Sequence, residues 1–111
     1  MAWEVVMDEE FEAWLKSLDA RQSVRINAYI GLLEECGPNL GRPRVDAVKG
    51  SKVRNLKELR IPISGDPWRV LFAFDPTRRA ILLVGGNKRG DDRWYEVNVP
   101  IAEKRLSRWL S

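Results

Sequence analysis

The chain contains no histidine. This absence excludes imidazole as a general acid or base, and with it nucleophiles that depend on a neighbouring histidine, such as Ser-His-Asp triads and Cys-His pairs. It also excludes zinc sites of the usual cysteine and histidine type, because the chain has one cysteine, Cys36. Any catalysis must therefore use other side chains.

Cysteine and long apolar runs are equally scarce. A single cysteine forms no disulfide within the chain, which is typical of a reducing compartment. The longest apolar runs have about five residues, far fewer than the ~20 that a membrane span needs. The start also lacks the basic and apolar regions of a secretory signal. We expect a cytoplasmic protein without membrane contact, with a single domain over residues 1–111.

Charge is unevenly distributed along the chain. Residues 1–35 hold eight acids and three bases, whereas residues 36–111 hold sixteen bases and eight acids. Within 42–60 there are seven bases against two acids. Such an asymmetry favours a positive face that binds phosphates, with a solvated mixed surface as the alternative.

Hydrophobic periodicity predicts most of the elements. Apolar residues at helical spacing follow Asp8, and a second such run follows Asp19, which has capping-box spacing to Gln22. Gly37 and Pro38 end the second helix. The other expected elements are strands at 3–7, 55–61, 68–74 and 80–84, a loop at 38–54 with a short helical turn at 44–48, and a helix at 100–110.

The order of elements is β-αα-βββ-α, which indicates an α+β fold. Two helices joined so tightly form an antiparallel hairpin, and three strands with short turns form a small antiparallel sheet. We expect the helical hairpin on one face of this sheet, a C-terminal helix, and an open face that can hold a site.

Charged residues alternate on two of these strands. Glu58 and Arg60 share one face of the first, and Arg69 lies on the next, where it can reach them. The alternative to a functional site is a structural cross-strand salt bridge. Beyond the last strand, two glycines precede the basic residues Lys88 and Arg89, and the aromatic pair Trp94 and Tyr95 follows. Basic side chains and aromatic rings in a loop are suited to binding single-stranded RNA. The alternative is that both rings are core residues.

Three segments together resemble the RelE/ParE superfamily of bacterial toxins, and most closely its phage-derived, HigB-like branch. They are Asn55 to Arg60, Trp68 to Phe74, and Leu83 to Arg89, and the order of elements agrees with that fold. The resemblance implies the toxin of a type II toxin–antitoxin system that cleaves mRNA on the ribosome, with the 2′-hydroxyl as nucleophile. Sites of this kind use arginine, lysine and tyrosine in place of histidine.

The resemblance also implies which residues form the site. Arg60 and Arg69 match the strand arginines of the pattern, Lys88 and Arg89 match its basic pair, and Tyr95 follows Arg89 at the expected interval. The sequence departs from the pattern on the first of these strands, where Leu56 and Glu58 stand in place of lysines. The candidate catalytic residues are Arg60, Arg69, Lys88, Arg89, Tyr95 and Glu58, and the candidate RNA-binding residues are Arg54, Lys57, Lys52 and Trp94.

RNA transesterification needs a base for the 2′-hydroxyl, positive charge at the phosphorane, and an acid for the 5′-oxygen. Arg60 and Arg69 can hold the phosphate oxygens, and either Glu58 or Tyr95 can be the base. Lys88 or Arg89 can assist the leaving oxygen. No cofactor and no metal ion are expected.

The sequence is also compatible with two other functions. One is a ParE-like toxin that poisons DNA gyrase, and the other is a non-catalytic basic binding protein of the same fold. As a toxin, the chain needs a cognate antitoxin, which in HigB-like systems usually resembles a helix-turn-helix protein.

Overall fold

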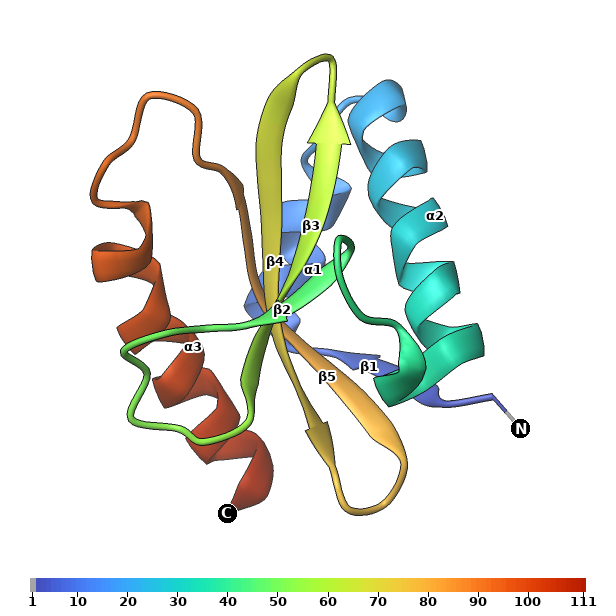
Figure 1. Ribbon diagram of the computed structural model, residues 1–111, viewed down its shortest axis with the longest axis vertical. Coiled ribbons are helices and arrows are strands. Elements are labelled where there is room, and N and C mark those ends of the chain that lie inside the picture. Colours follow the sequence, from blue (N-terminus) through green and yellow to red (C-terminus); the bar gives the residue numbers. More distant parts are fainter. Residues whose placement is uncertain (1) are drawn as a thin grey trace.

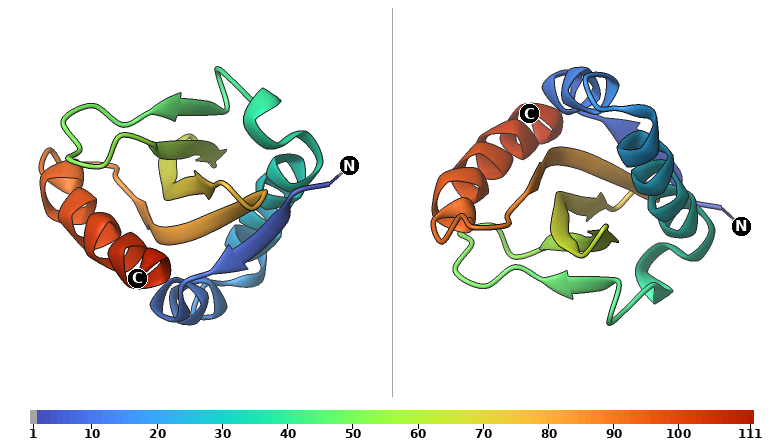
Figure 2. Two further views of the ribbon diagram at one scale, coloured as in Figure 1. Left: turned by 90° about the horizontal axis from the view of Figure 1, so that it is seen from below. Right: turned by 90° about the horizontal axis from the view of Figure 1, so that it is seen from above.

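The computed structural model describes residues 2–111, which form a five-stranded sheet with helices on both faces (Figures 1 and 2). The strand order is β1-β5-β4-β3-β2; β1 pairs parallel with β5, and all other neighbours pair antiparallel. The elements are β1 (Glu4–Met7), α1 (Glu9–Lys16), α2 (Ala20–Cys36), the 3₁₀ helix η1 (Gly37–Asn39), β2 (Val45–Ala47), β3 (Leu56–Ile63), β4 (Asp66–Asp75), β5 (Arg79–Asn87) and α3 (Trp94–Leu110).

Side-chain caps fix the starts of the first two helices. The Asp8 carboxylate accepts hydrogen bonds from the backbone N–H groups of Glu10 and Phe11. Asp19 and Gln22 form the expected capping box, in which each side chain accepts from the other residue's backbone N–H. The α+β class, the helical hairpin and the C-terminal helix are thus confirmed, and none of the helices in residues 2–111 is long and apolar enough to cross a membrane.

Each face of the sheet has its own hydrophobic core. Helices α1 and α2 pack against one face, where Leu59, Val70 and Phe72 are buried. Helix α3 packs against the other, where Leu71 and Ala73 are buried. The expectation that one whole face stays open is wrong, because α3 covers part of it; the site must lie on the part that α3 leaves uncovered (Figure 2).

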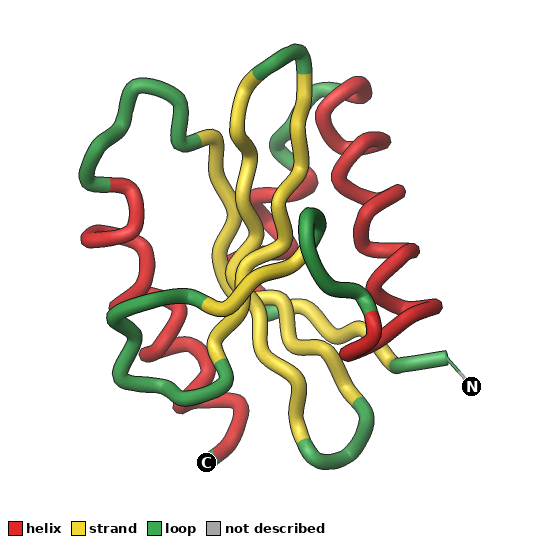
Figure 3. The backbone as a smooth tube through the Cα atoms, viewed as in Figure 1, coloured by secondary structure: helices red, strands yellow, loops and turns green. Residues whose placement is uncertain are grey.

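The loop expected at 38–54 contains a strand and no helical turn at 44–48. Val45–Ala47 forms β2 and pairs with β3, so Asp46 lies opposite Glu58. Three residues are too few to show a period-2 pattern, and this segment is a strand because it pairs with β3. After β2 the chain crosses α3 before it enters β3 (Figure 3), held there by Glu103, whose carboxylate accepts from the Ser51 hydroxyl at 2.9 Å and the Lys52 N–H at 2.6 Å.

Strand β5 does not end at the two glycines but continues through them to Asn87. A Cβ on Gly85 would lie 2.2 Å from Trp14 Cζ3, and a Cβ on Gly86 would lie 2.7 Å from Trp94 Nε1. These glycines therefore make room for two indoles, one on each face of the sheet, and give no flexible hinge.

Helix α3 begins at Trp94, six residues before the expected start at Pro100. Proline is common in the first turn of a helix, so the sequence pattern favoured a start there. In the structure Pro100 lies inside the helix on its exposed side, where water can solvate the carbonyl that proline leaves without an N–H donor.

Strand β3 extends beyond its short partner β2. At this end of the pair, Arg60 N–H donates to the carbonyl of Arg44, the residue before β2, at 2.7 Å. The next residue of β3 that faces this edge is Pro62, which has no N–H, and its carbonyl accepts from Arg25 Nε at 3.1 Å.

Candidate active site

Sheet register brings the predicted strand residues together. Arg60 on β3 lies directly opposite Arg69 on β4, and Arg69 lies opposite Gly86 on β5. Glu58 is two residues before Arg60 and shares its face, which is the face that α3 partly covers. Because Gly86 has no side chain, the first turn of α3 can approach this row, and Tyr95 reaches it.

Glu58 is the centre of the cluster. It is only 4% exposed, and its Oε2 accepts from Arg60 Nε at 3.2 Å and Arg60 Nη2 at 3.0 Å. Its Oε1 accepts a short hydrogen bond from the Tyr95 hydroxyl and lies 3.4 Å from Arg69 Nε. This buried carboxylate is therefore fully compensated by two guanidinium groups and one phenol.

Tyr95 is held as a protonated phenol. Its side chain is half-buried, and burial raises the pKa of the hydroxyl above its ordinary value of 10.0, as does the hydrogen bond to Glu58. The bond that Arg69 Nε donates to Tyr95 Oη, at 3.2 Å, acts in the opposite direction on this pKa but does not reverse the shift. At neutral pH the hydroxyl thus donates to Glu58 and accepts from Arg69.

Asp46 joins the cluster from the edge strand. Its Oδ2 lies 3.4 Å from Arg60 Nη2, and its Oδ1 lies 3.3 Å from Arg42 Nε. The N–H of Ala47 holds the pKa of the Asp46 carboxyl below its ordinary range, with further help from the two arginines. The hydrogen bond to Glu58 raises the pKa of Arg60 above its ordinary value.

The two basic residues of the loop after β5 occupy different places. Lys88 Nζ lies over the Tyr95 ring, 5.7 Å from its centroid, so this lysine belongs to the cluster. Arg89 instead pairs with Asp66 at the start of β4, where Nη1 donates to Oδ1 at 2.9 Å. The structure therefore brings together five of the six predicted catalytic residues and holds Arg89 at the start of β4.

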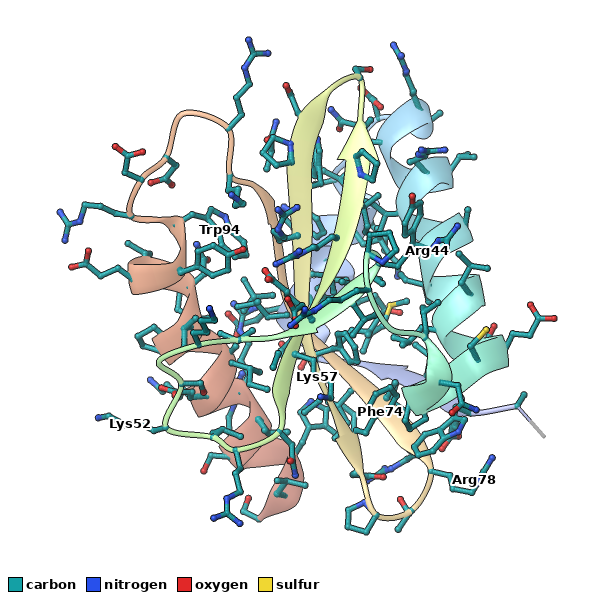
Figure 4. All side chains as sticks on the ribbon, in the orientation of Figure 1. Arg44, Lys52, Lys57, Phe74, Arg78 and Trp94 are labelled. Atoms are coloured by element: carbon teal, nitrogen blue, oxygen red, sulfur yellow. The ribbon has the colours of Figure 1, made fainter. Side chains whose placement is uncertain are left out.

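The four predicted RNA-binding residues are dispersed. Lys52 and Arg54 are exposed on the segment between β2 and β3. Lys57 points to the opposite face of the sheet from Glu58 and lines a hollow with Phe74 (Figure 4). Trp94 is only 5% exposed and packs over Gly86, so its ring has no free face on which a base could stack.

A hollow of about 370 Å³ opens beside the cluster. We call it the active-site hollow; it lies between β2, β3 and the start of α3 and is lined by Asp46, Ala47, Val48, Lys49, Glu58, Arg60 and Tyr95. Sequence reasoning missed Asp46 as a site residue. The sequence around it carries no strand signal, and the β2–β3 register is needed to place it opposite Glu58.

The arrangement can bind an anion and move a proton. Arg60, with a side chain 38% exposed, offers N–H donors at the edge of the active-site hollow, with Arg69 beside it at 14%. The Tyr95 hydroxyl can pass its proton to Glu58 when another hydroxyl gives one to it. Among residues 2–111 no group of three metal-binding side chains gathers at this place.

Comparisons with known proteins show what the chain is similar to. Two proteins of Mycobacterium tuberculosis (strain ATCC 25618 / H37Rv) are similar in sequence. One, named "Putative toxin HigB3", is 46% identical over 96% of this chain and 93% of its own length. The other, "Putative toxin HigB2", is 44% identical over 93% of this chain and 52% of its own length.

A solved structure and a family model also match the chain. The free-state structure of a mutant E. coli toxin RelE matches with a TM-score of 0.61 and 14% identity, over 96% of this chain and 99% of that one, which shows the fold. The resemblance to the HigB-like branch of the RelE/ParE superfamily is thereby confirmed. The family model described as phage derived protein Gp49-like (DUF891) matches residues 13–107, and the chain belongs to this family.

Proposed function

We propose that this protein is the toxin of a type II toxin–antitoxin system and acts as a ribosome-dependent mRNA endoribonuclease. The observation that carries the proposal is the cluster of Glu58, Arg60, Arg69 and Tyr95 beside the active-site hollow. It supplies a proton acceptor, an anion site and a hydroxyl relay in one place without histidine. The similarity to two proteins named as toxins supports the same conclusion.

The reaction is a transesterification within the RNA. The 2′-oxygen forms a bond to phosphorus while the bond from phosphorus to the 5′-oxygen breaks, which leaves a 2′,3′-cyclic phosphate and a free 5′-hydroxyl. Arg60 and Arg69 hold the nonbridging oxygens and stabilise the charge of the phosphorane. Because their N–H donors already lie in place, little reorganisation accompanies the developing charge.

The proton of the 2′-hydroxyl moves through Tyr95. The Tyr95 oxygen accepts it while the tyrosine gives its own proton to Glu58, so the buried carboxylate is the final base and the phenol stays neutral. We assign the role of base to Glu58 acting through Tyr95, because a phenol with a raised pKa is a poor base alone. Lys88, beside the Tyr95 ring, donates the proton to the 5′-oxygen.

The experiment is a short induced pulse of expression followed by mapping of mRNA 5′ ends and measurement of translation. We expect new ends within translated codons for the wild type, and their loss in the Arg69→Ala/Arg89→Ala double variant. Arg21→Ala, an exposed arginine on α2, is the matched control and should cut like the wild type. Growth arrest with intact mRNA would refute the nuclease and favour gyrase poisoning or another binding mechanism.

The relay has its own test. Tyr95→Phe keeps the ring but removes the hydroxyl, and we expect mRNA cleavage to fall about a hundredfold, as for loss of a general acid or base. Unchanged cleavage by Tyr95→Phe together with loss by Glu58→Gln would leave Glu58 as a direct base and exclude the relay.

A toxin must be held inactive in the cell that makes it. We therefore include a cognate antitoxin in the proposal, of the helix-turn-helix type, with an acidic segment that covers the arginine cluster. Co-expression of the adjacent reading frame and co-purification of the complex is the direct test, and a chain that stays non-toxic without any partner would refute it.

A further inference from the structure

A second hollow adjoins the cluster and has no part in the chemistry described above. Its volume is about 380 Å³, and it lies between α2, the segment before β2, and the turn that joins β3 to β4. It shares Arg60 and Arg69 with the cluster. In Figure 4 Arg44, which also lines it, lies on the α2 side of the β3–β4 hairpin, whereas Trp94 lies on the α3 side.

Four rings form part of the walls of this hollow. Pro43, Pro62, Pro67 and Tyr29 line it, and we call it the ring-walled hollow. The Arg25 guanidinium lies 5.5 Å from the centroid of the Tyr29 ring and supports it from α2. Flat apolar and aromatic surfaces of this kind pack on the face of a nucleobase, and they do so with little regard to which base it is.

Beside its three arginines, Arg44, Arg60 and Arg69, the hollow contains one acidic group that can distinguish bases. The Asp66 carboxylate lines it, with a side chain 22% exposed. Its orientation is fixed, because Oδ2 accepts from Asn87 Nδ2 at 3.0 Å and Oδ1 accepts from Arg89 Nη1 at 2.9 Å. A carboxylate oxygen accepts about two hydrogen bonds, so each oxygen keeps one acceptor position.

Two parallel acceptors match two adjacent N–H donors. Guanine carries such a pair, N1–H and the 2-amino group, on its Watson–Crick edge, and that edge is free in single-stranded RNA. Adenine and cytosine present one donor group beside an acceptor, which a carboxylate repels. The fixed Asp66 carboxylate therefore suits guanine.

We propose that the ring-walled hollow binds the guanine base of the nucleotide next to the cleaved phosphate, and that Asp66 recognises its Watson–Crick edge. The inference rests on the proposed function, because Arg60 and Arg69 border the hollow and also hold the scissile phosphate. A phosphate on these arginines places the adjoining nucleotide within reach of the rings. Asp66 thus determines specificity, while Tyr29 contributes affinity.

The test measures binding without cleavage. Trinucleotide RNAs with methylated 2′-hydroxyls, which cannot be cut, carry guanine, inosine or adenine at the same position and are titrated into the full chain by NMR. We expect guanine to bind about tenfold more tightly than inosine or adenine, as for one good bidentate contact. The largest shifts should fall on the amides of Gly65 and Asp66.

Two variants separate the roles. Asp66→Asn should abolish the preference for guanine, and Tyr29→Ala should weaken all three probes by about tenfold without changing their order. Asp92→Asn, an exposed acid beyond β5, carries the same charge change and should bind like the wild type. Far-UV circular dichroism of each variant establishes that it is folded.

The outcomes separate this inference from the proposed function. Equal binding of the three probes, or shifts confined to other surfaces, would overturn base recognition even if mRNA is cut. Guanine preference that vanishes in Asp66→Asn would support it even if the pulse experiment finds intact mRNA, because the titration requires no cleavage.

Discussion

Two networks in this protein pair one buried carboxylate with two arginines, and both lie against α3. In the first, Glu58 is 4% exposed; in the second, Asp8 is 3% exposed. Glu58 binds Arg60 and Arg69, whereas Asp8 Oδ1 lies 3.3 Å from Arg108 Nη2 and Asp8 Oδ2 lies 3.7 Å from Arg105 Nε. By composition alone the two networks are nearly the same.

Their surroundings differ. Asp8 caps α1 and binds the end of α3 to it. The hollow beside it is lined by three acids, one arginine and Trp109, and the excess of acids repels a phosphate. Glu58 instead accepts from a tyrosine hydroxyl at the edge of a hollow that contains arginine and lysine. A buried carboxylate between arginines therefore indicates a reactive site only when a transferable proton and a place for the substrate accompany it.

The largest expected contrast comes from matched amide substitutions. Glu58→Gln keeps the shape of the side chain and an acceptor for Arg60 but removes the base, so mRNA cleavage should fall by two to three orders of magnitude. Asp8→Asn should cleave like the wild type. Mapping of mRNA 5′ ends at equal protein level measures cleavage by both variants. Similar losses of cleavage in the two would contradict the claim that only the Glu58 network is catalytic.

A substitution beside the first network should disturb both stability and activity. In Gly86→Ala the new methyl group overlaps Trp94, and we expect a loss of about 2 kcal/mol in the free energy of unfolding, as for overpacking elsewhere. Cleavage should fall too, because Tyr95 follows Trp94 in the same turn. Urea unfolding and the cleavage assay report the two effects; a stable but inactive variant would confine the role of Gly86 to the site.

The second network should affect stability alone. Asp8→Ala removes the cap of α1 and the shared partner of Arg105 and Arg108, so the free energy of unfolding should fall by about 1–2 kcal/mol. Cleavage per folded molecule should be unchanged. Urea unfolding at neutral pH measures the loss, and a loss of cleavage at full stability would contradict this assignment.

The smallest expected effect is the loss of stability when Tyr95 titrates at high pH. The folded state favours the neutral form of Tyr95, so the stabilisation from its hydrogen bond is complete below the ordinary pKa of 10.0 and is lost as pH rises through the raised pKa. The chain has two tyrosines, so the difference in tyrosinate absorbance between wild type and Tyr95→Phe isolates this group. A midpoint at or below 10.0 would contradict the burial of the hydroxyl and its bond to Glu58.

Much of the first network could be predicted from the sequence, because it depends on local periodicity. Alternation placed Glu58 and Arg60 on one face, and the short β3–β4 turn brought Arg69 opposite Arg60. Capping residues and apolar spacing likewise predicted α1 and α2.

What sequence reasoning missed depends on contacts between distant segments. Asp46 belongs to the site only because an otherwise unmarked strand pairs with β3, and Arg89 is diverted by Asp66, which precedes it by 23 positions. Gly85 and Gly86 suggested a flexible loop, since nothing local reveals that Trp14 and Trp94 need the space. Periodicity predicts the face of a strand or helix on which a residue lies, but not which side chain from a distant segment contacts it.

The free end of β3 affects how copies of the chain meet. An uncovered strand edge offers N–H and C=O groups to any other strand and is a common start of aggregation. Beyond β2 this edge presents Pro62, which has no donor, and a carbonyl already occupied by Arg25. At this position, next to the ring-walled hollow, the edge therefore offers a strand of a second copy neither an N–H donor nor an unoccupied carbonyl.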